Sequence, residues 1–213
     1  TQSVTGVGFQ PDFSWLKGRS DAEGARLFDT VRGANNALFS NSVLQEVVVS
    51  GELTSFITDG FTLGSNENVN QSGETYVAWN WKGAEIPAIN SNGSIPSVVS
   101  ANPAAGFSIV SYTGNGVIPS TYGHGLNDTP KVVIVKNRDG SSDWTFNFNL
   151  TPTGAMFGQL NTTSALSQTT WMGGTSSVVS MLFENSNLQN ANGNDYIAYC
   201  FAEVAGFSKF GSY

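Results

Sequence analysis

The chain has 213 residues, of which only 12% are charged, and its nine basic and 16 acidic residues give a net charge of −7. This length supports one or two domains with a buried core, and so few basic residues argue against nucleic acid or an anionic membrane as a partner. The single cysteine excludes an internal disulfide, no apolar run is long enough for a membrane span, and the 24 glycines favour an all-β protein with many tight turns.

Short runs of β-branched and aromatic residues predict strands along the whole chain, and Asp-Gly or Asn-Gly pairs between them predict tight turns. In the first part of the chain the predicted strands cover residues 12–17, 46–49, 55–58, 61–63 and 76–81. Residues 19–31 have a weak helical spacing, and a loop or a single turn fits equally well.

Residues 83–105 are rich in Asn, Ser, Pro and Ala and predict an extended connection, with one short strand at 97–100. Strand signals then resume. The predicted strands of the second part cover residues 107–112, 131–136, 144–150, 178–184 and 196–202.

The sequence contains an internal repeat. The block at residues 6–19 returns at 123–138, and the strand at 73–81 returns at 193–201, at offsets of 117 to 120 residues. A nearly constant offset over two separated blocks indicates duplicated units.

The fold class that these patterns predict is all-β, an antiparallel β-sandwich or jelly roll built from two related repeat units. We expect the units to be fused into one sandwich, because one shared core buries their few apolar positions better than two small sandwiches would. The predicted divisions are residues 1–85 for the first unit, 86–105 for the connection, 106–205 for the second unit and 206–213 for a closing segment.

The closing segment at 206–213 resembles the strand that begins the second unit at 106. Either it is a strand that is shared or exchanged between units, or the sequence is part of a longer repeat array. In the first case Phe207, Phe210 and Tyr213 are candidates for self-association, since a free strand can pair with the edge of a neighbouring sheet.

Signals for catalysis are weak. The single histidine, His124, lies between two glycines in a predicted turn, and its counterpart in the first unit is Val7, which argues against a catalytic triad. A glycosidase needs two carboxyl groups that face one cleft. The acidic residues that we considered each stand alone or lie in a predicted turn: Glu74, Glu184, Asp195 and Glu203. We therefore expect a protein that is not an enzyme.

Two oxygen-rich loops are weak calcium candidates, through Asn66 and Glu67 in the first unit and Asn192 and Asp195 in the second. Calcium takes six to eight oxygen ligands. Each loop has few carboxylates and no defined ligand spacing, so an Asx-rich turn is the simpler interpretation. We expect no other cofactor.

Aromatic residues give one candidate contact. Trp79 and Trp81 alternate along a predicted strand, as Tyr199 and Phe201 do in the second unit, which places each pair on one face and favours core packing over sugar binding. Trp171 lies in a loop-like setting and is the best candidate for an exposed contact aromatic.

The one charged motif kept in both units is a Lys-x-Arg pair at the end of a strand, Lys17 with Arg19 and Lys136 with Arg138. Because charges are scarce, two matched pairs indicate a shared role. We expect a structural role in preference to ligand binding. The partners that we weigh are Asp29, Asp143 and groups of a neighbouring chain.

Several motifs together carry a family resemblance. They are Gly-Phe-Gln-Pro-Asp-Phe-x-Trp-Leu-Lys-x-Arg at 8–19, Leu-Phe-Asp-Thr-Val-Arg-Gly at 27–33, Leu-Thr-Ser-Phe-x-x-Asp-Gly-Phe-x-Leu-Gly at 53–64 and Tyr-Val-Ala-Trp-Asn-Trp-Lys at 76–82, followed by the strand at 106–116 and the close at 196–213. This order resembles a repeat module of marine bacteriophage structural proteins, notably those of cyanophages. The resemblance covers most of the chain and implies a concanavalin-like jelly-roll sandwich in virion fibres, spikes or decoration proteins, without catalytic residues.

From these observations we predict a non-enzymatic structural protein on the surface of a bacteriophage virion, as a capsid decoration, fibre or tail-fibre module. Its partners would be copies of itself and other virion proteins, with no nucleic acid and no membrane insertion. The alternative is a lectin-like, carbohydrate-binding module that recognises a glycan on the host surface.

Overall fold

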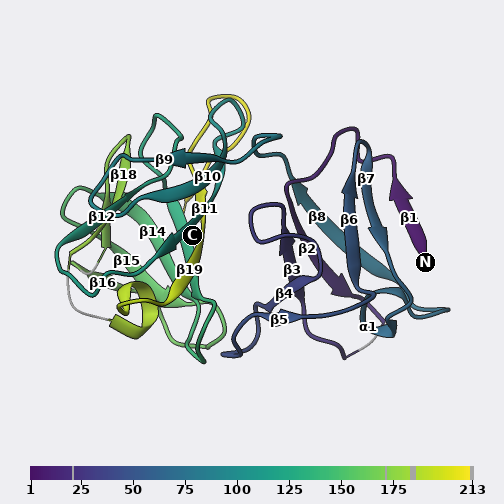
Figure 1. The fold of residues 1–213 in the computed structure, drawn as a ribbon. Coiled ribbons are helices and arrows are strands. Elements are labelled where there is room, and N and C mark those ends of the chain that lie inside the picture. The colour runs from purple at the N-terminus through teal and green to yellow at the C-terminus, as the bar shows by residue number, and fades with distance from the viewer. Residues whose placement is uncertain (21, 171, 183–185, 212–213) are drawn as a thin grey trace.

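The computed structural model describes residues 1–20, 22–170, 172–182 and 186–211, and the fold is all-β (Figure 1). The first half contains eight strands and one short helix. Its elements are β1 (Gln2–Thr5), β2 (Phe13–Gly18), β3 (Arg26–Asp29), β4 (Asn36–Phe39), β5 (Val47–Val48), β6 (Leu53–Ile57), β7 (Gly60–Leu63), α1 (Glu67–Asn70) and β8 (Tyr76–Trp81).

The second half contains the remaining strands and one short π-helix, η1 (Ser186–Asn190). Its strands are β9 (Ala88–Asn90), β10 (Ser97–Asn102), β11 (Phe107–Thr113), β12 (Ser120–Gly123), β13 (Val132–Asn137), β14 (Thr145–Thr151), β15 (Gly154–Gln159), β16 (Ser167–Thr169), β17 (Met172–Gly174), β18 (Val178–Met181) and β19 (Asp195–Phe201). No described helix is both long and apolar enough to cross a membrane.

Four antiparallel sheets stack in a sandwich-like arrangement. The first half has a three-stranded sheet in the order β1-β7-β6 and a five-stranded sheet in the order β5-β4-β3-β2-β8. The second half has an eight-stranded sheet in the order β16-β15-β14-β13-β19-β11-β10-β9 and a three-stranded sheet in the order β12-β18-β17. The two larger sheets face each other in the middle of the stack (Figure 1).

Hydrophobic cores fill the three spaces between these layers. Side chains alternate across β2, so that Leu16 packs between the sheets of the first half while Phe13 points to the second half. In the same way β19 sends Tyr199 into the middle core and Tyr196 into the core of the second half. In place of the single fused core that we expected, each half therefore has its own core and the two halves share a third.

The eight strands of the first half have counterparts in the second half, in the same order within the sheets. The register agrees as well, because Phe13 on β2 lies opposite Trp81 on β8, and Val132 on β13 lies opposite Phe201 on β19. The sequence blocks that recur thus lie on corresponding strands of the two halves. The second half differs by its additional strands β9, β10 and β11, which extend the sheet beyond β19.

Every strand predicted before residue 203 is present, most of them with shifted ends, and residues 183 and 184 of one of them lie outside the described residues. The possible helix at 19–31 is wrong, because residues 26–29 form β3 in the middle of a sheet. The expected connection at 86–105 is more ordered than predicted, since it supplies β9 and β10 to the eight-stranded sheet.

One predicted Asp-Gly turn shows how local sequence fixes a sheet. Gly60, with φ +151, begins β7 directly below the carbonyl oxygen of Val4, where any Cβ atom would collide. Asp59 accepts hydrogen bonds from the backbone nitrogens of Gly6 and Gly8 at 2.9 and 2.6 Å. The turn between β6 and β7 therefore also holds the end of β1.

Candidate functional site

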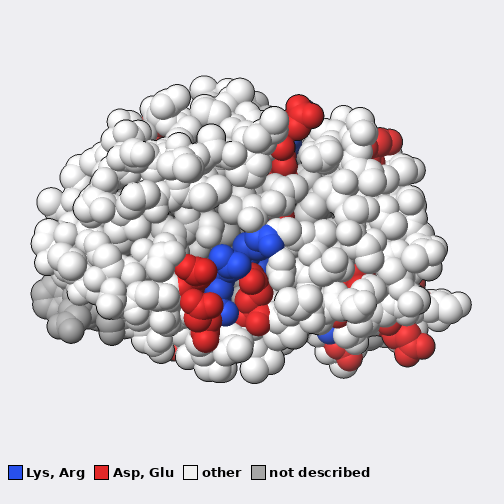
Figure 2. Space-filling view, viewed as in Figure 1, with Lys and Arg blue, Asp and Glu red and all other residues white. Residues whose placement is uncertain are grey.

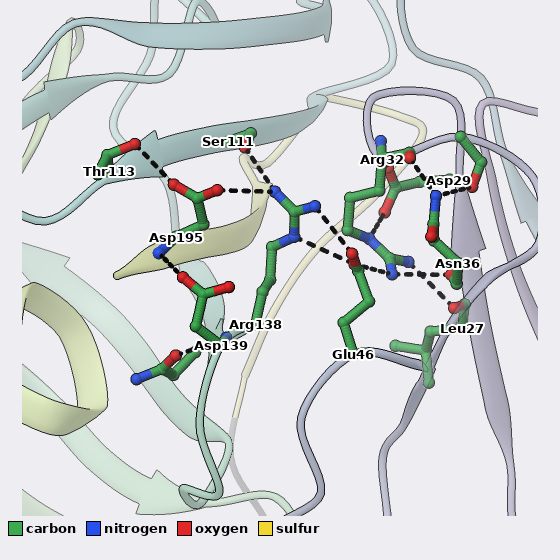
Figure 3. Close-up of polar contacts among 12 residues, drawn as sticks. Leu27, Asp29, Arg32, Asn36, Glu46, Ser111, Thr113, Arg138, Asp139 and Asp195 are labelled. Carbon is green, nitrogen blue, oxygen red and sulfur yellow. Dashed lines mark hydrogen bonds and ion pairs between the residues drawn. The ribbon is translucent and has the colours of Figure 1, made fainter. Parts of the chain in front are cut away.

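A chain of alternating charges crosses the boundary between the two halves, and we call it the charged seam. Its members are Asp29, Arg32, Glu46, Arg138 and Asp195. Figure 2 shows blue and red atoms meeting at this boundary on a face that is otherwise mostly uncharged, and Figure 3 shows how the side chains point toward one another. Because only 12% of the chain is charged, this concentration makes the seam the best candidate for a functional site.

The end of the seam in the first half is fully buried. Asp29 ends β3, and the turn that follows brings Arg32 Nε to 2.6 Å from Asp29 Oδ2, with both side chains at 0% exposure. The Arg32 guanidinium also donates to the carbonyl oxygens of Leu27 and Asn36, at 3.0 and 2.9 Å. Burial opposes the charge of Arg32, but the carboxylates of Asp29 and Glu46 outweigh burial and raise its pKa.

Glu46 lies between the two arginines at the centre of the seam. Arg32 Nη1 is 2.9 Å from Glu46 Oε2, while Arg138 donates through Nε to Oε2 at 3.1 Å and through Nη2 to Oε1 at 2.9 Å. Such two-pronged contacts between arginine and a carboxylate are among the strong hydrogen bonds of proteins. Burial alone would raise the pKa of Glu46. The hydrogen bonds from Arg138 and Arg32 outweigh burial, and the pKa lies below its ordinary value of 4.5.

Backbone hydrogen bonds fix the loop that carries Glu46. Its nitrogen donates to Arg138 O at 3.0 Å, and the nitrogen of Ser142 donates to Val43 O at 3.0 Å. The loop that follows β4 in the first half is thus attached to the loop that follows β13 in the second.

The ammonium of Lys136 reinforces the same junction. Lys136 is at 0% exposure, and its Nζ donates to the carbonyl oxygens of Asn137, Val43 and Gly140 at 2.8, 3.3 and 3.3 Å. Burial lowers its pKa to about 8, against the opposite influence of the Asp143 charge. Since Val43 belongs to the first half, Lys136 also joins the two halves.

Asp195 ends the seam at the surface, where its side chain is 46% exposed and lies 4.0 Å from Arg138 Nη1. Its Oδ1 accepts a hydrogen bond from Thr113 at 2.7 Å, and its backbone nitrogen donates to Asp139 Oδ2 at 2.6 Å. Figure 3 shows how these contacts continue the seam from Arg138 to Asp195 and Thr113 within the second half.

The charges of the seam are arranged to hold the two halves of the molecule together. Positive and negative groups alternate along the seam, so each buried charge is held by a neighbour of opposite sign. A general base or nucleophile needs a lone pair directed at a substrate, whereas the oxygens of Glu46 are directed at two arginines. Removing one charge from such a chain leaves another buried charge without compensation.

The Lys-x-Arg pair of the first half has a local role. Lys17 Nζ donates to the carbonyl oxygens of Gly18 and Glu23, at 2.6 and 2.7 Å, within its own half. Arg19 is exposed. The structure therefore does not bring the two matched pairs into one site, and only the pair of the second half, with Arg138, enters the seam.

Sequence reasoning missed two central members of the seam. Arg32 carried only a weak signal, the opposite charge of Asp29 three residues before it, because the same spacing also occurs at residues 23 and 26, 82 and 85, and 136 and 139. Glu46 carried no such signal, because its partner Arg138 is 92 residues away. We considered Asp29 and Asp143 as partners of the Lys-x-Arg pairs, but the ion-pair partner of Arg138 at the core of the seam is Glu46.

The calcium candidates belong to different halves and are not brought together. Asn66 is the N-cap of α1 and accepts a hydrogen bond from Asn68 N at 3.0 Å, and Glu67 is the first residue of that helix. Asn192 and Asp195 lie in the turn before β19 and at its start. Within the described ranges, no group of three or more His, Cys, Asp or Glu side chains is placed to hold a metal.

His124 is part of the structure of the second half. Its Nδ1 accepts a hydrogen bond from Leu126 N at 3.2 Å, and its Nε2 lies 3.1 Å from Thr175 O. Burial lowers the pKa of the imidazole, although the contact with Thr175 partly opposes this. Glu184 lies outside the described residues.

The aromatic pair of β8 divides between two environments. Trp81 and Trp79 lie opposite Phe13 and Trp15 on β2, so they share a face as expected. Trp81 packs in the middle core, whereas Trp79 is 48% exposed and meets Trp15 edge-on at 6.4 Å. Core packing is thus right for Trp81 and incomplete for Trp79, because β8 is the open edge of its sheet. Trp171 lies outside the described residues.

The self-association candidates lie beyond the last strand. Residues 206–211 form no strand, in contrast to the expectation of a closing strand. Phe207 is 74% exposed, while Phe210 packs against Phe201 with ring centroids 6.3 Å apart. Tyr213 lies outside the described residues.

Comparison with known proteins gives one match. No curated protein and no solved structure matches the chain. One family model, described as a domain of unknown function, matches residues 1–213. This chain therefore belongs to the DUF7483 family.

Proposed function

We propose that the protein is a structural component of a bacteriophage particle, a module of a surface fibre, spike or decoration protein without enzymatic activity. It acts by attaching to the particle and to copies of itself. The motif order that resembles phage structural repeats supports this proposal, and so does the sandwich-like stack of sheets, which is suited to a rigid building block.

The observation that carries the proposal is where the scarce charges are used. Arg32, Glu46, Lys136 and Arg138 all make contacts inside the molecule, and all four bridge the two halves directly. An enzyme of this size would be expected to direct some of its buried charges at a substrate. In a structural module, buried charges serve instead to hold the parts of the molecule together.

The test is the composition of purified particles. Mass spectrometry of phage particles from a culture that encodes this chain should find the protein at a fixed number of copies for each particle. Antibody-gold labelling should then place it on the outer surface. If the protein stays in the soluble lysate and is missing from purified particles, the proposal is wrong.

One observation favours a second candidate, a glycan-binding module. A cavity of about 700 Å³ opens beside β15 and β16, and amide and hydroxyl side chains that suit sugar hydroxyls line it together with Phe157. The polar side chains are Asn149, Thr151, Thr153, Ser167, Gln168, Thr169 and Thr170.

A glycan array tests this candidate, with Gln168→Ala and Phe157→Ala as variants. Binding that both variants weaken would support a sugar site in this cavity. An array without hits, or hits that neither variant changes, would exclude it.

A further inference from the structure

The two halves differ at one equivalent edge. In the second half, β19 is covered on its outer side by β11. In the first half, the counterpart β8 is the last strand of its sheet, and no described strand covers the same side. An uncovered edge presents unpaired backbone groups to a further strand.

The covered edge shows what kind of strand fits. Phe107 on β11 lies opposite Phe201, and Ser108 lies opposite Cys200. By the equivalence of the two halves, the corresponding positions on β8 are Trp81 and Asn80.

The chain carries a second segment of the same kind. Gly106, which precedes β11, and Phe107 and Ser108, which begin it, recur as Gly, Phe and Ser at positions 206–208. At the first position of the strand, Phe107 is 1% exposed whereas Phe207 is 74% exposed. The second copy therefore has the sequence of an edge-covering strand but not its burial.

Within one chain this segment is held in a turn. An isolated antiparallel bridge joins Val204 to Ser208, and the nitrogen of Phe210 donates to Glu203 Oε1 at 3.0 Å. The segment makes no described strand pairing with β8. It lies next to that strand, however, because residues 207, 208 and 210 line a groove of about 420 Å³ together with residues 80–82.

We propose that residues 206–211 of one chain add as an antiparallel strand to the β8 edge of a second copy of this chain. The register follows that of β11 on β19, with Phe207 opposite Trp81 and Ser208 opposite Asn80. Lys209 then lies opposite the half-exposed Trp79, where a cation over an indole ring is favourable. This inference rests on the self-association included in the proposed function and names its surface.

A second copy is the occupant because the chain's own segment is engaged elsewhere. Glu203 and Val204 hold it in the turn, so the edge of β8 stays open in the single chain. When the segment leaves this turn to join a neighbour, it also vacates the groove beside β8. The segment at 206–211 and the β8 edge that receives it are different surfaces of the chain. Repeated addition therefore builds an open chain of copies or a closed ring.

Cross-linking between two different variants tests the register. One full-length chain carries Asn80→Cys and the other Ser208→Cys, both with Cys200→Ala so that no native thiol competes. Residues directly opposite in an antiparallel pair have Cα atoms about 4.5 to 5.5 Å apart, which is within the range of a disulfide. Mixing the two variants under mild oxidation should give a disulfide-linked dimer on a non-reducing gel.

The matched control replaces the acceptor by Val48→Cys, on the strand at the other edge of the same sheet. It should give no dimer with Ser208→Cys. Absence of the first dimer, or equal amounts of both, contradicts the proposal. A single chain that carries both Asn80→Cys and Ser208→Cys also contradicts the proposal if it forms only an intramolecular disulfide, since the segment would then cover its own β8.

A second variant separates association from folding. Phe207→Ser changes an exposed side chain in the single chain, so its urea unfolding should match that of the unchanged protein. Loss of one buried phenyl ring from the docked strand should weaken association about tenfold to a hundredfold, as measured by light scattering over a concentration series. Unchanged association, or an unchanged protein that stays monomeric throughout, overturns the proposal.

The two proposals can fail separately. A protein that is found in particles but does not cross-link contradicts only the β8 interface. A protein that cross-links in register but is missing from particles contradicts only the proposed function.

Discussion

Arg32 shows how a charge can be buried without loss of its ionisation. Its guanidinium replaces lost water by the carboxylates of Asp29 and Glu46 and by two backbone carbonyl groups. A buried ion pair adds little when it is compared with a well-packed apolar pair, but it is costly to break from one side. At the residue scale, Arg32 and its carboxylate partners therefore depend on one another, because removing one leaves another buried charge unpaired.

Replacing Arg32 by methionine keeps the volume and removes the charge. Arg32→Met should lower the free energy of unfolding by about 3 to 5 kcal/mol, because the fully buried Asp29 would lose its ion-pair partner. The control Arg19→Met, at an exposed position, should change it by less than about 0.5 kcal/mol. Urea unfolding of both variants gives the comparison, and equal effects would contradict the role of Arg32.

Acid should weaken the seam through Glu46. Its pKa in the folded chain lies below the ordinary value of 4.5, so its contribution is fully present above that value and is lost as the pH falls through the folded-state pKa. Glu46→Gln should therefore be less stable than the unchanged protein at neutral pH, and the difference should shrink as the pH falls below 4.5 and through the folded-state pKa of Glu46. Urea unfolding at several pH values measures this, and a difference that grows in acid would refute it.

At the element scale, the hairpin of β6 and β7 depends on Gly60. Gly60→Ala should cost about 3 kcal/mol or more, because its Cβ would strike Val4 and push β1 off the sheet edge. The control Gly73→Ala, where φ is +86 and nothing lies within 4 Å, should cost only the strain of a left-handed alanine, about 1 to 2 kcal/mol. Hydrogen exchange of the β1 amides should accelerate in the first variant only.

The strands that could be predicted from the sequence are those with dense apolar signals. All six residues of β13 are buried, and β19 has a similarly continuous apolar run. Short or polar strands such as β16 and β17 were not predicted, because three residues give no readable period. β3 was obscured by the charged residues at its ends, Arg26 and Asp29, which are buried only because they have partners.

The candidate site was less predictable than the fold. The repeat drew attention to Arg138 and Lys136, but the role of each is set by the loop that carries Val43 and Glu46, which lies in the other half. Contacts over such sequence distances depend on how the sheets stack. No local pattern in the sequence encodes that stacking.

At the scale of the whole molecule, the middle core makes the two halves interdependent. Phe13 of the first half stacks on Tyr199 of the second, with ring centroids 4.2 Å apart, and the seam closes the same interface at its polar edge. The two halves should therefore unfold together, as a single cooperative transition.

Two probes can test this cooperativity in one urea titration. Cys200 lies in the core of the second half at 0% exposure, and burial raises its pKa to about 12, so a thiol reagent should react only after unfolding. Tryptophan fluorescence follows the middle core through Trp15, Trp81 and Trp144. The two midpoints should coincide, and thiol exposure at a clearly lower urea concentration would show that the second half opens alone.

The path of the chain between the halves has a mechanical consequence. After Trp81 the chain forms β9 at the outer edge of the eight-stranded sheet, then β10, and only then the inner strand β11. Tension between the halves would peel β9 and β10 away in turn and release residues 88–102, about 50 Å of extended chain. Under tension, β9 and β10 would thus detach and lengthen the chain before β11 is pulled from β19.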